Sequence, residues 1–202
     1  MHKCNKKAEL TSRDLISLGI FNAIAMVAYF GVATVAGTTV IGLLVCSAVA
    51  FLPMGVVYML MAVKIKKRGV FLISGAVLAI IAMTSGRIYH AVGCVVGGLL
   101  AEFLAGKNKY QKSGEIILAY VTLAFVEFLG IYLPFFILGQ EYMLSRGNKV
   151  AITPDTVNTF LSYFTTGNFF LIALLNIVGA YLGAKLGLRV VNKHFRKAGL
   201  VE

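Results

Sequence analysis

Six long apolar runs, separated by short polar or basic segments, fill most of this 202-residue chain. A helix needs about 20 mostly apolar residues to cross a bilayer, because lipid cannot satisfy a bare peptide group. The pattern therefore predicts an all-α, polytopic membrane protein with six transmembrane helices. The expected spans cover residues 15–36, 41–63, 70–84, 89–105, 116–139 and 168–190. The third and fourth spans are short, and we expect them to pair as a tight hairpin.

Basic residues gather in alternate connections between the runs. If the N-terminus is cytoplasmic, sixteen of the 19 lysines and arginines fall on the cytoplasmic side, and only Arg87, Arg146 and Lys149 fall outside. An excess of Lys and Arg marks the cytoplasmic face of a membrane protein. The chain is therefore expected in the plasma membrane of a prokaryote, with both termini in the cytoplasm.

The outer side carries one long connection, residues 140–167. Within it, Thr153, Pro154 and Asp155 are typical of a helix start, and the following residues place apolar side chains at helical spacing. We expect a short amphipathic helix over residues 156–165 at the outer interface. A loop of this length in a compact protein usually serves as a lid or a binding loop.

The composition agrees with one integral membrane domain covering residues 1–202. Hydrophobic residues make up 59% of the chain and charged residues 13%, against about 25% charged in soluble domains. Little of the chain is left for a separate soluble catalytic domain. The net charge of +11 lies in the connections, so nucleic acid is not an expected partner.

No pattern in the sequence predicts an enzyme. HExxH, GxSxG and P-loop motifs are missing, and the three cysteines lack the spacing of a disulfide framework or a zinc site. The three histidines cannot form a metal site unless the fold adds other ligands. We therefore expect no catalytic residue, no cofactor and no metal site, and any transport would draw its energy from a partner.

Glu127 lies near the middle of the fifth expected span. A carboxylate at that depth is costly unless it is protonated, paired or hydrated. One interpretation is a protonated side chain that bonds Asn22 or Asn176 on a neighbouring helix. The other is a polar group at the floor of a ligand cavity. A second acidic residue, Glu102, is expected to pair with Lys107 or Lys109.

Polar and aromatic residues are expected to form a mouth at the outer side. Arg87, Tyr89 and His90 cluster where the third and fourth spans meet, although such residues are often only interfacial anchors or surface groups. The predicted substrate-binding residues are Arg87, Tyr89, His90, Glu127, Tyr132, Glu141, Tyr163, Asn168 and Asn176.

Small residues recur at four-residue spacing in three spans, which permits close approach of helices in lipid. Gly179, Gly183 and Gly187 mark the last span, and a similar row beginning at Gly93 marks the fourth. We expect these two rows to pack inside the bundle. Gly19 and Ala23, near the cytoplasmic end of the first span, are more suited to docking against another membrane protein.

Several stretches resemble those of a known family. They are residues 10–28 with the opening LTSRDL, the basic turn at residues 64–69, and GCVVGGLLAEFLAG at residues 93–106. With six spans and both termini inside, the chain resembles an S component of the energy-coupling factor (ECF) transporters, and within these the Trep_Strep, or MptD-like, group.

This resemblance implies an S-component-like bundle that captures a vitamin-like or other small micronutrient on the outer face. It implies two kinds of partner, a transmembrane coupling protein and two cytoplasmic ATPase subunits. The coupling protein would dock at Gly19 and Ala23, although this family usually has alanine at both positions. The alternative from the residues alone is a non-transporting membrane scaffold or regulatory subunit.

Overall fold

The computed structural model describes residues 10–147 and 154–195, without the side chains of residues 140, 141, 143–147, 154–156, 194 and 195. Its elements are α1 (Ser12–Ala36), α2 (Val40–Ile65), α3 (Val70–Thr84), α4 (Ile88–Gly106), α5 (Ser113–Gly147), α6 (Pro154–Ser162), α7 (Thr166–Val190) and the π-helical turn η1 (Val191–Phe195). The described residues contain no strand, so the predicted all-α class is confirmed.

Five of these helices are long and apolar enough to cross a membrane, and the sixth apolar helix, α3, has 15 residues. A 15-residue helix rises only about 22 Å, less than the roughly 30 Å of a bilayer core. The predicted bounds of the third span coincide with α3, and those of the fourth fall one residue short at each end. The observed helices therefore confirm a polytopic helical membrane protein, and α3 is shorter than a full span.

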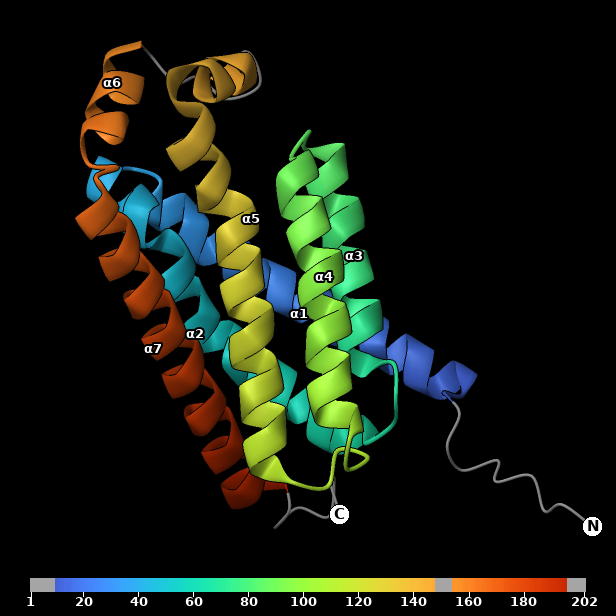
Figure 1. Cartoon of the computed structure of the whole chain (residues 1–202). Coiled ribbons are helices and arrows are strands. Elements are labelled where there is room, and N and C mark those ends of the chain that lie inside the picture. The colour runs from blue at the N-terminus through green and yellow to red at the C-terminus, as the bar shows by residue number, and fades with distance from the viewer. Residues whose placement is uncertain (1–9, 148–153, 196–202) are drawn as a thin grey trace, which may run out of the picture.

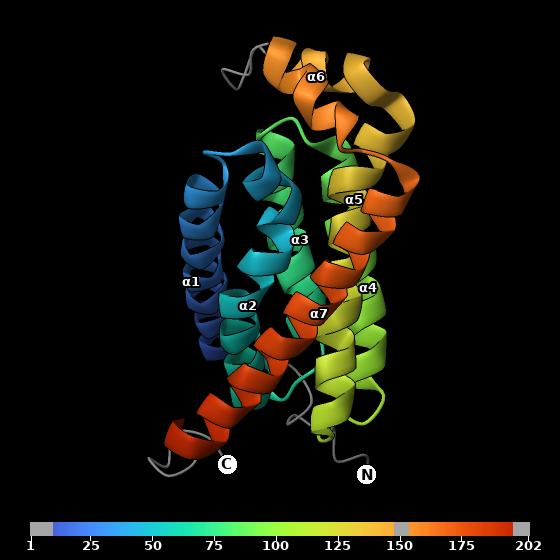
Figure 2. The same ribbon diagram turned by 90° about the vertical axis from the view of Figure 1, so that its left-hand side faces the viewer.

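The helices form two tightly packed pairs, α2 with α7 and α4 with α5, and α3 packs on α4 (Figure 1). Helix α1 lies at the edge beside α2 (Figure 2). The α2–α3 and α4–α5 connections lie at the same end of the bundle as the start of α1 and the end of α7. We call this the basic end, because the lysines and arginines at residues 64–68 and 107–112 lie there; α6 lies at the opposite end.

Glycines allow the backbones to approach closely in the α2–α7 and α4–α5 pairs. A Cβ atom at Gly183 of α7 would lie 2.5 Å from the carbonyl oxygen of Phe51 on α2, and a Cβ at Gly93 of α4 would lie 3.0 Å from the carbonyl oxygen of Val126 on α5. Backbones this close leave no room for a side chain, and tight van der Waals packing is what holds helices together in lipid. The predicted internal role of both small-residue rows is confirmed.

Helix α5 is broken at Gly139, which has a φ of 57°. Glycine tolerates this conformation because it lacks a Cβ. The predicted end of the fifth span coincides with the break, but the chain continues as helix to Gly147 and crosses the opposite end of the bundle (Figure 1). The expected loop at residues 140–167 therefore begins with a further helical segment.

The predicted amphipathic helix is present as α6, but it covers Pro154–Ser162 and not residues 156–165, and Thr165 instead caps the start of α7. Val157 and Phe160 are buried, whereas Asn158 and Thr159 are exposed. The buried face packs on a second apolar cluster that includes Phe128 of α5. Helix α6 thus covers the opposite end of α2, α5 and α7 (Figure 1).

The prediction for Glu102 was wrong. Its Oε2 atom accepts hydrogen bonds from the backbone N–H of Phe71 at 3.2 Å and from the hydroxyl of Tyr110 at 2.6 Å. Helix α3 begins after Gly69, which provides no capping side chain. The free N–H groups of a helix start attract a carboxylate, so Glu102 caps α3 and does not pair with Lys107 or Lys109.

Candidate functional site

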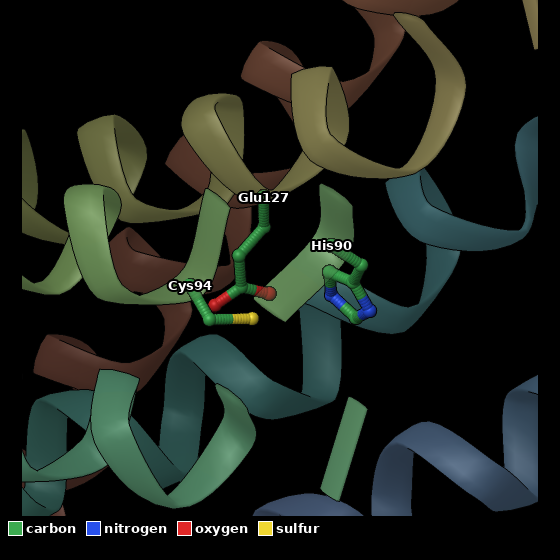
Figure 3. Close-up of side chains that lie close together, drawn as sticks. All are labelled: His90, Cys94 and Glu127. Carbon is green, nitrogen blue, oxygen red and sulfur yellow. The ribbon is translucent and has the colours of Figure 1, made fainter. Parts of the chain in front are cut away.

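Three side chains of the types that carry chemistry meet inside the bundle. His90 and Cys94 are four residues apart on α4 and therefore share one face of that helix. Glu127 projects from the middle of α5, and the close contact at Gly93 brings the two helices together beside it. Figure 3 shows the Glu127 carboxylate with the Cys94 thiol and the His90 ring on either side of it.

The cluster is compact and buried. The nearest ring nitrogen of His90, the sulfur of Cys94 and a carboxylate oxygen of Glu127 all lie within 4.8 Å of one another. The exposed fractions of the three residues are 8%, 0% and 3%. We refer to His90, Cys94 and Glu127 as the buried triad.

A cavity of about 20 Å³ adjoins the triad. Its polar lining comes from Tyr29, Arg87, His90 and Glu127, and the remaining walls are apolar. A space of this size holds one water-sized occupant. The structure thus brings together Arg87, His90 and Glu127 from the predicted substrate site.

Glu127 Oε1 is buried and accepts no hydrogen bond from the part of the chain that the structure describes. Both expected amide partners bond elsewhere. Asn22 donates to the carbonyl oxygen of Leu18 at 2.8 Å and to Ser74 Oγ at 3.1 Å, and Asn176 donates to Ser47 Oγ at 3.2 Å. The interpretation of Glu127 as bonded to Asn22 or Asn176 was wrong, because each amide instead joins its helix to the neighbour it packs against.

The other predicted mouth residues do not line this cavity. Tyr89 is half exposed and packs edge-on against Tyr142, with ring centroids 5.6 Å apart. Tyr163 is exposed, and its carbonyl oxygen accepts a hydrogen bond from the Asn168 side chain at 2.8 Å within the α6–α7 turn. The Glu141 side chain lies outside the described residues.

Tyr132 belongs to the aromatic packing at the opposite end of the bundle. Its ring stacks on Phe128, with centroids 4.9 Å apart, and on Phe164, with centroids 6.1 Å apart. Its hydroxyl donates to the carbonyl oxygen of Leu43 on α2 at 3.0 Å. These contacts give Tyr132 a packing role under α6.

A second and larger space lies on the other side of the α4–α5 contact. It is a groove of about 660 Å³, lined almost wholly by apolar residues such as Val92, Leu129 and Pro134. None of the triad residues lines it. Its chemistry suits hydrocarbon, whereas the small cavity beside Glu127 has polar groups in its walls.

Cys94 is the member of the buried triad that was not among the predicted site residues. Its four-residue spacing from His90 was a visible signal, since those positions share a helix face. The third member is 33 residues further along the chain, and nothing in the sequence specifies which face of α5 meets α4.

The two predicted docking residues lie on a free surface of α1. Gly19 and Ala23 are exposed, and a Cβ at Gly19 would meet no described atom within 4 Å. Large apolar residues flank them, and Ile16 and Ile20 are also exposed. This face is available to lipid or to another membrane protein.

Comparison with known proteins identifies a family but not an activity. No protein of curated function and no solved structure matches the chain. One family model, described as a hypothetical bacterial integral membrane protein (Trep_Strep), matches residues 12–197. That range includes every helix that the structure describes, from the start of α1 at Ser12 to the end of η1 at Phe195, and the chain therefore belongs to the Trep_Strep family of bacterial integral membrane proteins.

Proposed function

We propose that this protein is the substrate-binding membrane subunit of an ATP-driven ECF-type importer for a vitamin-like or other small micronutrient. In this proposal the basic end faces the cytoplasm, and substrate is captured from the opposite end. The partners are a transmembrane coupling protein and two cytoplasmic ATPase subunits. The protein itself performs no catalysis.

The observation that carries the proposal is the position of α1. In its most apolar 18-residue stretch 22% of the residues are buried, against 39–44% in the other four candidate spans. It packs mainly on α2 at the edge of the bundle (Figure 2). A helix with so little internal contact, and with small residues on its free face, is suited to close packing against another membrane protein.

The distribution of charge supports the orientation. Both basic connections, residues 64–68 and 107–112, lie at one end together with Lys185 and Arg189 of α7. Positive connections favour the cytoplasmic side. The coupling protein would then contact α1 near the cytoplasmic side, where Gly19 lies.

Helix α6 supports capture from the opposite end. It covers that end through two buried side chains, Val157 and Phe160, and has only nine residues. Short elements with few buried contacts open at low free-energy cost. Movement of α6 would expose the apolar cluster between α2, α5 and α7, to which Tyr132 belongs, and a substrate could then enter from that end.

Docking is tested by enlarging the small residues of α1. Gly19→Leu and Ala23→Leu should remove co-purification with the coupling protein and the ATPases, and should abolish ATP-dependent uptake in vesicles. Gly31→Leu is the matched control, because Gly31 lies about three turns further along the same helix and also has open space around it. It should leave the complex intact.

A full chain that folds but never associates with a coupling protein would contradict the proposal and favour a scaffold or regulatory subunit. Loss of the complex with Gly31→Leu as well as with Gly19→Leu would also contradict it, because docking would then not depend on the end of α1 that carries Gly19. Elution of each variant as a monodisperse species in detergent establishes that it is folded.

A further inference from the structure

We propose that His90, Cys94 and Glu127 form a binding site for a divalent transition-metal ion of the zinc class. This inference goes beyond the proposed transport function and does not depend on it. The site lies where α4 and α5 are held closest (Figure 3).

The ligand types fit such an ion. A histidine nitrogen, a cysteine thiolate and a carboxylate oxygen are the three protein ligands that zinc uses, and three such ligands with a free fourth position are typical of its exchangeable sites. Hard ions such as Mg²⁺ and Ca²⁺ prefer oxygen ligands alone. On binding, Cys94 releases its proton and the sulfur bonds to the metal.

The distances permit a common ion. With metal–ligand bonds of about 2.0–2.3 Å, the ligand atoms of a tetrahedral site lie about 3.3–3.8 Å apart. The triad atoms already lie within 4.8 Å of one another. Rotations that move the side-chain ends by about 1 Å would complete the site without a change in the helices.

The size of the cavity favours an ion over an organic ligand. At about 20 Å³ it holds one water-sized occupant, whereas pockets for drug-sized molecules measure about 300–1,000 Å³. The fourth ligand of the metal would therefore be a water molecule in this cavity. A vitamin-sized substrate does not fit there.

The unpartnered carboxylate points to the same occupant. Glu127 Oε1 is buried without a hydrogen bond from any described group, and leaving such a group unsatisfied destabilises the folded protein. The ion pairs among the described residues join Lys67 to Asp14 and Lys112 to Glu115, so no Lys or Arg nitrogen there lies within 4.0 Å of Glu127. A metal ion would supply the missing partner.

Arg87 sets a limit on the affinity. Its side chain lines the same cavity, and its permanent positive charge opposes a second cation nearby. The three metal–ligand bonds must outweigh this repulsion. We therefore expect a site that exchanges its ion and not one that holds it permanently.

Cobalt provides a direct test on the full chain, purified in detergent and stripped with a chelator. One Co²⁺ per chain should bind, with the intense near-ultraviolet absorption of a thiolate–cobalt bond, and Zn²⁺ should remove that absorption. Cys94→Ser should abolish the band, and His90→Gln and Glu127→Gln should each weaken binding by at least about 10-fold.

Cys46→Ser is the matched control, because Cys46 is the other buried free thiol of the described chain and lies on α2. It should leave the spectrum unchanged. Failure of the wild-type protein to bind Co²⁺ or Zn²⁺, or a band that persists in Cys94→Ser, would overturn the proposal.

X-ray absorption by the Zn²⁺-loaded wild-type protein covers the case in which Cys94→Ser does not fold. One sulfur neighbour at about 2.3 Å is expected, and a shell of oxygen and nitrogen alone would overturn the site. Because these measurements need no partner protein, a negative result leaves the association with ATPases untouched. Uptake of radioactive zinc into vesicles with the partners then distinguishes a transported ion from one that stays bound.

Discussion

Two carboxylates on neighbouring helices, Glu102 and Glu127, have opposite surroundings. Glu102 lies at the basic end of α4, where one of its oxygens accepts hydrogen bonds from Phe71 and Tyr110. Glu127 lies in the middle of α5, 3% exposed, and its Oε1 accepts no hydrogen bond from a described group. Glu102 Oε2 joins α4 to α3 and to the α4–α5 connection, although Glu102 Oε1 has no described partner. Glu127 makes no such link between helices.

The contrast separates structural from functional polar groups. Buried polar atoms are nearly always hydrogen-bonded, and an exception calls for an explanation in a ligand, an ion or a chemical role. For Glu102 Oε2 the partners are within the protein. In the Glu127 region the explanation has to come from outside, which is why the site is proposed there.

The largest expected effect is the loss of Glu102. Glu102→Met removes both hydrogen bonds and leaves the N-terminus of α3 without its carboxylate. Because hydrogen bonds to charged groups contribute about 1.5–3 kcal/mol each, the free energy of unfolding should fall by about 3 kcal/mol. Thermal unfolding in detergent measures the change. Glu102→Gln keeps an oxygen acceptor and should lose about half as much; equal losses would mean that the cap is unimportant.

The same substitution at Glu127 should change the free energy of unfolding in the opposite direction. Glu127→Met removes a buried acid whose Oε1 accepts no hydrogen bond from a described group and replaces it with an apolar chain of similar length. The metal-free protein should gain stability, but by less than the about 1–3 kcal/mol of an unsatisfied buried group, because Arg87 in the same cavity loses a nearby opposite charge. Stability gained at the cost of function is typical of functional sites. If Glu127→Met instead destabilises the chelator-treated protein as much as Glu102→Met does, Glu127 has a structural role and the contrast fails.

The sequence predicted most of the fold because membrane helices are specified locally. Apolar length sets each span, and the glycine rows of α4 and α7 mark the surfaces that pack. The apolar spacing after Pro154 was likewise enough to predict α6. These features depend on residues within one helix, so a single sequence contains them.

The site was predicted only in part, because it depends on how helices are placed side by side. Arg87, His90 and Glu127 were expected at a ligand site and do share a cavity. Cys94 was overlooked, and Tyr132 and Asn176 bond α2 instead. The partners of Glu102 were missed for the same reason, since Phe71 is 31 residues away and reaches it only through the α3–α4 hairpin.

A smaller loss of stability is expected for Tyr110, which donates the second hydrogen bond to Glu102. It lies in the α4–α5 connection, where burial, and secondarily the bond to Glu102, raise the pKa of its hydroxyl above the ordinary value of about 10. Tyr110→Phe should cost about 1–2 kcal/mol, because Glu102 keeps its bond from Phe71. Unfolding measured at neutral pH tests this.

The raised pKa of Tyr110 also predicts a pH dependence. The unfolded chain releases the phenolic proton near pH 10 while the folded protein keeps it, so this contribution to stability is complete below pH 10 and declines as the pH rises further. The wild-type protein should therefore lose stability above pH 10 more steeply than Tyr110→Phe does. Identical slopes would show that folding does not raise the pKa of this hydroxyl.

The smallest effect is expected for the ion pair of Lys67 with Asp14, whose nitrogen and oxygen lie 2.6 Å apart. Both side chains keep about a fifth of their surface exposed, so water and salt screen the attraction, and such pairs contribute about 0–1 kcal/mol. Lys67→Met should therefore lower stability by less than 1 kcal/mol, and by still less at high salt.

Asp14 also accepts a hydrogen bond from the backbone N–H of Thr11 in the capping box that starts α1, so Asp14→Asn should cost more stability than Lys67→Met. A double-mutant cycle isolates the pair itself. A coupling energy as large as the loss in Glu102→Met would show that partial exposure does not weaken charge pairs at the basic end. The contrast between Glu102 and Glu127 would then need a cause other than their hydrogen bonds.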